Sequence, residues 1–442
     1  MTVVIRFSAP VKAEAKIIYV DAKNTGFEDG SKEYPYNTIK EGINAAASGD
    51  TVFVYNGTYR QSFIVLDKDN LSLIGENRDF TIIDSMRMDW VLVITAQNIT
   101  VTGFTIQNGS LGTGGVFLDY AVKSRISDNI IKNHLDSGIY ARFSNGNVIE
   151  NNWMSDNYAG IVLSSLCTEN KVSNNDVIGN TRGIDLSHHA RYNDVRNNNI
   201  VQNTYGLSIS HENNSVFGNR IVNNDVGVYE DLEVGAAHGY RIFHNNFINN
   251  TKQVDLRNSS VNAWDNGLEG NYWSDYNGTD FTQDGIGDTA PYIINGNNTD
   301  RHPLMGIFAE FPVTWEETNY YVTTICNSTM SAFKFDQFNK MMKFNVTVEE
   351  GLGFCRVTIP KIIIQDMWHK NYKVLVDGED PLITNNWTDT ESTYIYFTYQ
   401  YSEHEVVMTP ELPTWISMLL VLMVLTVAVA IYKRGLQKTP IH

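Results

Sequence analysis

The sequence predicts an all-β protein in which a coil of stacked parallel strands is followed by a small β-sandwich and one C-terminal transmembrane helix. Three observations predict this fold. A unit of 21 to 26 residues recurs through the middle of the chain, asparagine returns at two fixed positions of that unit, and an uncharged apolar run lies near the C-terminus. The 442 residues carry a formal net charge of -17, so the surface repels phosphate backbones and nucleic-acid binding is not expected.

The N-terminal residues are predicted to form a leader and then a cap. Residues 1–16 read as a leader or a truncated signal peptide, because Ala13-Glu14-Ala15 resembles a cleavage site while the apolar run before it is short. Residues 38–47 have the apolar spacing of an amphipathic helix. Such a helix would cover the open edge of the first coil.

The repeat itself is centred on a glycine followed by an apolar residue. This step occurs at Gly115, Gly138, Gly160, Gly183, Gly206 and Gly227, with a degenerate copy at Gln253. Short alternating runs flank each step and no helical period is present, so one unit cannot bury its apolar face alone. Stacking the units on one another would bury it.

Two columns of asparagine run through the repeats in register, eight and three residues before the glycine step. Asparagine tolerates left-handed backbone conformations, and its amide can bond to the equivalent position one coil further on. We therefore expect the columns to mark bends between strands. They contain Asn152, Asn175, Asn198, Asn219 and Asn245, and Asn157, Asn180, Asn203, Asn224 and Asn250.

These repeats resemble the right-handed parallel β-helix of the pectin-lyase-like superfamily, in particular the NosD-like carbohydrate-binding and sugar-hydrolase (CASH) repeat family of archaeal surface type. The segments 17–60 and 270–305 resemble the first and last segments of such helices, which implies a β-helix over residues 17–305. The resemblance is specific for fold and weak for activity. NosD itself is associated with copper-site maturation, but this chain has its own predicted anchor and sandwich, so the copper role is not carried over.

The remainder of the chain is predicted to be a stalk and an anchor. Alternating strand-like runs over 306–409 indicate an immunoglobulin-like β-sandwich, joined by a linker, 410–414, to the apolar run 415–432. That run is long enough to span a bilayer. Lysine and arginine in 433–442 place this tail in the cytoplasm and the bulk of the protein outside the cell.

Two further features concern the region around the stalk. Cys326 and Cys355 lie in neighbouring strand-like runs and would form a disulfide in an oxidising compartment. In the segment 280–288, acidic residues follow the spacing of a calcium loop, in which hard carboxylate and carbonyl oxygens surround the ion. The predicted calcium ligands are Asp280, Asp284, the carbonyl of Ile286, and Asp288, with capped turns as the alternative.

A ligand-binding face is predicted from side chains that should point outward after the glycine step. Three interpretations stay open beside a simple solvated face. The face binds a glycan, or it is the site of a polysaccharide lyase, hydrolase or epimerase, or its histidines hold copper or zinc. Its predicted members are Tyr140, Arg142, Asp185, His188, His211, Tyr229 and Asp231.

The favoured function is that of a membrane-anchored cell-surface protein that binds carbohydrate polymer or surface-layer components without catalysis. A long repetitive face suits a polymer better than a small molecule. Among 48 asparagines, twelve begin Asn-x-Ser/Thr sequons, and most of these lie outside the repeat tract. We therefore also expect an exterior glycoprotein.

Overall fold

The computed structural model describes residues 15–211, 213–230, 237–257, 259–411 and 426–429. Contacts divide the chain into two compact units. Of the described residues, the β-helix unit contains those from 15 to 279 together with 286–304, and the sandwich unit contains 280–285 together with those from 305 to 411. The segment 280–285 therefore packs with the sandwich unit, although it precedes the boundary at 305 that the sequence indicated.

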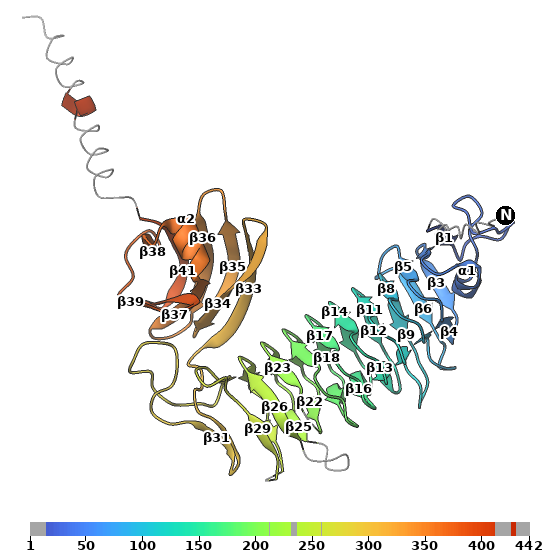
Figure 1. The fold of residues 1–442 in the computed structure, drawn as a ribbon, viewed down its shortest axis with the longest axis horizontal. Helices are drawn as coiled ribbons and strands as arrows, with labels where there is room; N and C mark the ends of the chain where they lie inside the picture. The colour runs from blue at the N-terminus through green and yellow to red at the C-terminus, as the bar shows by residue number, and fades with distance from the viewer. Residues whose placement is uncertain (1–14, 212, 231–236, 258, 412–425, 430–442) are drawn as a thin grey trace, which may run out of the picture. The chain divides into compact units, whose positions relative to one another are not determined.

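Three parallel sheets form the β-helix unit, and successive coils stack in chain order along one axis (Figure 1). The eleven-stranded sheet contains β1 (Ile17–Val20), β2 (Thr51–Val54), β5 (Ser72–Gly75), β8 (Thr100–Thr102), β11 (Arg125–Ser127), β14 (Val148–Glu150), β17 (Lys171–Ser173), β20 (Asp194–Arg196), β23 (Ser215–Phe217), β26 (His238–Phe243) and β29 (Val261–Ala263). The ten-stranded sheet contains β3 (Gly57–Arg60), β6 (Thr81–Asp84), β9 (Thr105–Gln107), β12 (Ile130–Lys132), β15 (Trp153–Ser155), β18 (Asp176–Ile178), β21 (Asn199–Val201), β24 (Arg220–Val222), β27 (Asn246–Ile248) and β30 (Tyr272–Trp273). The predicted stacked parallel coil is confirmed.

The nine-stranded sheet is the one that carries the glycine steps. It contains β4 (Ile64–Leu66), β7 (Leu92–Ile94), β10 (Val116–Asp119), β13 (Ser137–Arg142), β16 (Ala159–Ser164), β19 (Arg182–Leu186), β22 (Tyr205–Ile209), β25 (Val226–Glu230) and β28 (Lys252–Asp255). A short antiparallel hairpin, β31 (Tyr292–Asn295) and β32 (Asn298–Asp300), follows the last coil.

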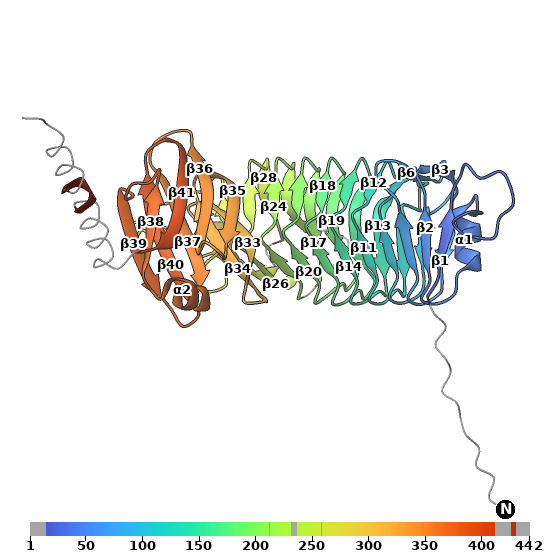
Figure 2. The same cartoon turned by 90° about the horizontal axis from the view of Figure 1, so that it is seen from above.

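A helix begins the stack at its N-terminal end, as Figure 2 shows. α1 (Ile39–Ala45) lies within the range expected from the sequence, and Thr38 caps it by accepting the N–H of Glu41. Its buried residues, Ile39, Gly42 and Ile43, face the β-helix, and the two isoleucines join its core. The helix thus covers the apolar end of the first coil, which would otherwise be an open edge.

The core of the β-helix consists of aliphatic residues in register from coil to coil. In the nine-stranded sheet, Ile139, Ile161, Ile184 and Leu207 are consecutive partners and all are fully buried. The glycine of each step packs against the backbone of the next coil. A Cβ on Gly183 would lie 2.3 Å from the carbonyl oxygen of Gly206, so no side chain fits there.

The asparagine columns form hydrogen-bonded ladders inside the bends. Asn157 accepts the backbone N–H of His134 at 3.1 Å, and its amide donates to the carbonyl of Ile131 at 3.2 Å and to Asn180 Oδ1 at 3.1 Å. Buried polar groups that satisfy one another in this way hold the coils in register.

The ladders differ from the sequence-based expectation in two respects. Their asparagines are not left-handed, because the positive φ falls on the preceding residue, as at Asp156, Gly179 and Gln202. A third ladder, which the sequence analysis missed, occupies another bend and contains Asn147, Asn170, Asn193 and Asn214. His134 occupies the ladder position before Asn157, where its Nδ1 accepts the N–H of Gly109 at 2.8 Å.

The sandwich unit consists of two antiparallel sheets and a helix. One sheet contains β33 (Ile307–Trp315), β34 (Thr318–Cys326), β37 (Gly353–Pro360), β40 (Ser392–Tyr399) and β39 (Ile383–Thr388), and the other contains β35 (Thr329–Asp336), β36 (Met341–Val348), β41 (Ser402–Pro410) and β38 (Tyr372–Val376). The helix α2 (Lys361–Trp368) was not expected from the sequence. Four of its residues, among them Ile363 and Trp368, are buried in the core of this unit.

The predicted disulfide lies within the described residues, whereas most of the predicted membrane span does not. Cys326 and Cys355 are direct cross-strand partners, and both are buried free thiols in this structure. No helix within the described residues is long and apolar enough to cross a bilayer. The predicted span 415–432 and tail 433–442 lie outside the described residues except for 426–429, which are helical, and the leader 1–16 lies outside them up to residue 14.

Candidate functional site

The outward face of the nine-stranded sheet arranges its side chains in columns. Strand register joins Phe117 to Tyr140, Tyr140 to Val162, Val162 to Asp185, Asp185 to Ser208, and Ser208 to Tyr229. Three of the predicted residues, Tyr140, Asp185 and Tyr229, therefore belong to one column. Neighbouring strands of a sheet lie about 4.8 Å apart, so Tyr140 and Tyr229 are about 19 Å apart along the axis.

Aromatic rings gather at the N-terminal part of this face. The rings of Trp90 and Phe117 stack with centroids 4.8 Å apart and an interplanar angle of 18°. Tyr140 is tilted against both, with centroid distances of 6.2 Å to Trp90 and 5.8 Å to Phe117. Three coils thus contribute one ring each to a single aromatic cluster.

An ion pair borders the cluster. Arg142 donates from Nε and a terminal nitrogen to the two carboxylate oxygens of Asp119, at 2.8 and 3.0 Å. Its guanidinium also lies over the ring of Phe117, 4.9 Å from the centroid. The hydrogen bond to Asp119 raises the pKa of Arg142 further, so the arginine stays charged and fixed in place.

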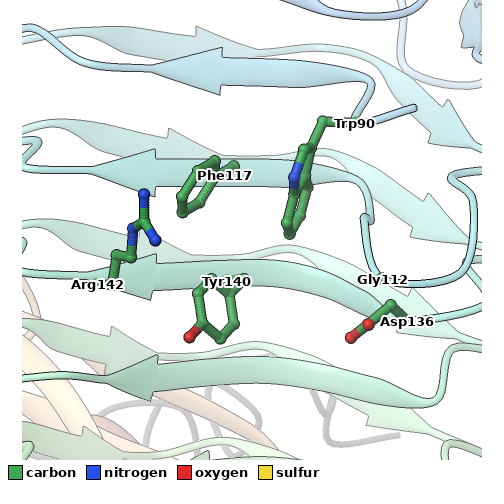
Figure 3. A pocket seen from close by; sticks show the side chains of 6 residues that line it. All are labelled: Trp90, Gly112, Phe117, Asp136, Tyr140 and Arg142. Carbon is green, nitrogen blue, oxygen red and sulfur yellow. The ribbon is translucent and has the colours of Figure 1, made fainter.

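These residues line a cavity of about 350 Å³, which Figure 3 shows. We call it the Trp90 pocket, and its lining consists of Trp90, Gly112, Phe117, Asp136, Tyr140 and Arg142. Its volume falls in the usual range of small-molecule sites, and it combines apolar rings with a few polar groups, as such sites usually do.

Loops between the ten-stranded and nine-stranded sheets complete the pocket. Trp90 lies near the end of the loop before β7, and Gly112 lies at a left-handed position, with φ of 74°, in the loop before β10. A Cβ on Gly114 would come within 2.9 Å of the Trp90 ring and 1.9 Å of the Ser137 carbonyl oxygen. The glycine-rich sequence of this loop therefore makes room for the indole.

The other predicted residues of the face lie outside the Trp90 pocket. Asp185 is buried and accepts a hydrogen bond from Arg182 at 2.7 Å. The ring of Tyr229 packs against Tyr205, with centroids 4.3 Å apart. Asp231 lies outside the described residues.

The two predicted histidines are placed differently. His188 is exposed in the turn after β19, whereas the ring of His211 contacts His189 at a centroid distance of 3.9 Å. Nδ1 of His211 also lies 3.2 Å from Ser210 Oγ. The observed ring contact thus uses His189 where the sequence analysis favoured His188.

A metal site on this face would need ligands that the fold brings together. No group of three or more His, Cys, Asp or Glu side chains arranged for a metal occurs among the described residues. The described residues therefore do not fit the copper or zinc site considered for the face.

The predicted calcium loop shows a turn at its start. The Asp280 carboxylate accepts the backbone N–H groups of Asp284 and Gly285, at 3.1 and 2.8 Å. Asp280 and Asp284 fall in the sandwich unit, whereas Ile286 and Asp288 fall in the β-helix unit. Calcium binding here stays a prediction.

Sequence reasoning missed part of the pocket. Trp90 and Asp136 precede their strands, whereas the predicted face contained only residues that follow the glycine step, so it did not include them. Phe117 and Asp119 do fall at outward positions of the repeat, and Asp119 could have been found as the coil neighbour of Arg142.

Comparisons with known proteins agree with this fold. The family model described as periplasmic copper-binding protein (NosD) matches residues 43–278. Two curated proteins named probable ABC transporter binding protein NosD, from Pseudomonas aeruginosa and Stutzerimonas stutzeri, are 40% and 38% identical over 88 residues, which is 20% of this chain. The matched segment spans 19% of each relative.

Solved structures with a similar chain path include sugar-polymer enzymes. The pectate lyase Pel9A has a TM-score of 0.45 and 13% identity, over 58% of this chain and 82% of its own. An alginate lyase from Paenibacillus sp. has a TM-score of 0.43 and 14% identity, over 58% of this chain and 94% of its own. At this level of identity the likeness concerns the fold and not the chemistry.

Proposed function

The chain belongs to the NosD family, whose model covers residues 43–278, and from this premise we propose that it is an extracytoplasmic, non-catalytic protein that binds a carbohydrate polymer. The binding site is the Trp90 pocket. The predicted C-terminal span would anchor the protein, with surface-layer glycans or glycoproteins as partners.

The observation that carries the proposal is the composition of the pocket wall. Aromatic rings supply the apolar faces and edges against which the C–H groups of sugars pack. Asp136 and Arg142 line the same cavity and supply hydrogen-bonding groups for hydroxyls. The rings come from β-strands or from turns adjoining them, so the site is formed before a ligand arrives.

A polymer is favoured over a small sugar because the site lies on a repeating surface. Beyond the pocket, the same column continues through Val162 and Asp185 to Tyr229. Val162 and Asp185 are buried, so a ligand would contact the pocket and the partly exposed Tyr229, about 19 Å from Tyr140, and only a chain of sugars spans both.

The test measures binding of the full-length chain to a panel of polysaccharides by affinity electrophoresis and calorimetry. Trp90→Ala should weaken binding at least about tenfold, because the ring forms one wall of the pocket. Trp153→Ala is the matched control, since Trp153 is an exposed tryptophan on the ten-stranded sheet and should leave affinity unchanged. If the panel shows no binding, or if both variants weaken it equally, the proposal is wrong.

The family description favours a second candidate, the handling of copper. The described residues do not supply the cluster of ligands that such a role requires. Retention of copper through dialysis by the wild-type chain, and its loss in a His189→Ala/His211→Ala variant, would support this candidate over glycan binding.

The enzymatic alternative, a polysaccharide lyase, hydrolase or epimerase, is tested with the same protein. Asp119 is engaged by Arg142 through both of its oxygens, which leaves it poorly placed to act as a base. Release of unsaturated uronates or reducing ends from any bound polymer would overturn the non-catalytic part of the proposal.

A further inference from the structure

The charges at the Trp90 pocket are unevenly balanced. Of its six lining residues only Asp136 and Arg142 are ionisable, with opposite signs, apart from the tyrosine hydroxyl. Arg142 already forms a two-point ion pair with Asp119. The positive charge of the pocket is therefore compensated from within the protein before any ligand arrives.

Asp136 has no such compensation among the described contacts. Its Oδ1 accepts the hydroxyl of Ser137 at 3.0 Å, and no ion pair to it is seen within the described part of the chain. Counting Asp119, Asp136 and Arg142 together, the pocket carries one net negative charge. The whole chain, at -17, adds to this potential instead of opposing it.

We infer that the Trp90 pocket selects uncharged glycans, such as hexose or pentose polymers, and discriminates against uronate polymers. This inference rests on the proposed function and assigns its ligand class. Asp136 is the specificity-determining residue, because its carboxylate accepts hydrogen bonds from sugar hydroxyls and repels a ligand carboxylate. Arg142, held against Phe117 and Asp119, donates to hydroxyls from a fixed position.

A uronate would gain little from the arginine. Each carboxylate that approached Arg142 would compete with Asp119 for the same guanidinium and would also meet the charge of Asp136. Like charges at one pocket disfavour binding unless a cation is added, and the effect falls as salt screens it.

The experiment compares neutral and acidic oligosaccharides of equal length on the full-length chain. Cellohexaose, mannohexaose and xylohexaose are titrated calorimetrically beside hexagalacturonate and hexamannuronate at low salt. At least one neutral hexasaccharide should bind at least about tenfold more tightly than either uronate, and the gap should narrow at high salt.

Two variants with the same chemical change sharpen the test. Asp136→Asn should reduce the discrimination against uronates to within about threefold, since it removes one like charge and keeps a polar group. Asp156→Asn is the matched control, because Asp156 is exposed in a turn away from the pocket wall and should leave the discrimination unchanged.

The outcomes separate the inference from the proposed function. If uronates bind more tightly than every neutral hexasaccharide and Trp90→Ala abolishes that binding, the inferred ligand class is wrong while glycan binding stands. If Asp136→Asn leaves the discrimination at its wild-type value, Asp136 is not the determinant. If no oligosaccharide binds, the proposed function itself fails.

Discussion

The β-helix unit and the sandwich unit differ in what lies at their centres. Inside the β-helix, buried asparagines such as Asn152, Asn175 and Asn198 are about 1% exposed and bond from coil to coil. The sandwich buries polar groups singly, such as Arg356 and Ser328, beside an apolar core cluster that contains Cys326 and Cys355, without a comparable ladder among its described residues. Because the backbone of the β-helix repeats, the same asparagine hydrogen bonds can form in every coil. A sandwich has no such repeat, so each buried polar group needs a partner of its own.

This difference predicts where single substitutions do the most damage. In the β-helix a substitution in one coil removes hydrogen-bond or packing partners from the next coil. Such a substitution should unfold the β-helix unit and spare the sandwich, which has its own core. Hydrogen exchange measured by mass spectrometry reports each unit separately and is the common readout for the following predictions.

The largest effect is expected at the glycine step. Gly183→Ala would place a Cβ 2.3 Å from the Gly206 carbonyl oxygen and should destabilise the β-helix by about 3 kcal/mol or more, since the neighbouring backbone must move. Gly179→Ala is the control in the same coil, because its Cβ meets nothing within 4 Å and the cost of a left-handed alanine is about 1 to 2 kcal/mol. Equal destabilisation by both would contradict the close-packing argument.

The next effect concerns the sandwich unit alone. Cys326 and Cys355 are directly paired across antiparallel strands, a spacing that suits a disulfide. If oxidation joins them, reduction should lower the free energy of unfolding of the sandwich by about 3 kcal/mol and leave β-helix exchange unchanged. Non-reducing peptide mapping of the exported protein checks the bond, and two free thiols there would refute it.

The third largest loss of stability is expected when an asparagine of a ladder is replaced. Asn180→Ala removes the acceptor of the Asn157 backbone and side-chain N–H groups, and leaves them buried without that partner. The expected cost is about 2 kcal/mol in urea-induced unfolding of the β-helix. Replacing the half-buried Asn199 by alanine should cost about 0.5 kcal/mol or less, because its hydrogen bonds to Asp176 and Arg220 lie near the surface.

The smallest effect at neutral pH, and the clearest pH dependence, belongs to His134. Burial lowers the pKa of His134 to about 3, from an ordinary value of 6.5. Below pH 6.5 the unfolded chain binds a proton that the folded chain excludes, so stability falls as pH decreases from 6.5 toward 3, by up to about 1.4 kcal/mol per pH unit. His134→Asn should remove this contribution and change stability at pH 7 by about 1 kcal/mol or less.

Unfolding of wild type and His134→Asn at pH 7 and pH 5 tests this prediction. Asparagine can repeat the contacts that His134 makes, since the imidazole accepts the N–H of Gly109 and contacts the Ile106 carbonyl as ladder amides do. An unchanged difference between the two proteins at the two pH values would contradict the assigned pKa.

Much of the fold could be predicted because its signals are local and repeated. The glycine step at Gly138, Gly160 and Gly183 indicated parallel stacking before any contact was known, and the two asparagine columns marked bends. The third ladder was missed although Asn170 and Asn193 stand five residues before Asn175 and Asn198, a constant spacing that could have revealed it. Helix α2 was missed because its eight residues follow a strand without a side-chain cap.

The candidate site was predictable only in part. Tyr140 and Arg142 follow from the repeat register, since they lie two and four residues after a glycine step. Trp90 and Asp136 do not, because they lie in turns whose course depends on the loops around Gly112 and Gly114. The predicted grouping of Asp185, His188 and His211 failed to anticipate the Arg182 ion pair and the His189 ring contact.

The amino-acid sequence by itself determined the coil, because each repeat carries its own glycine, aliphatic residues and asparagines, and a stack of such units buries them in only one register. Tertiary structure alone decided where a ligand would sit. The Trp90 pocket draws on residues as far apart in the chain as Trp90 and Arg142, from strand faces and loops of three coils. Their convergence depends on turn geometry and on the pairing of Asp119 with Arg142, which no single repeat encodes.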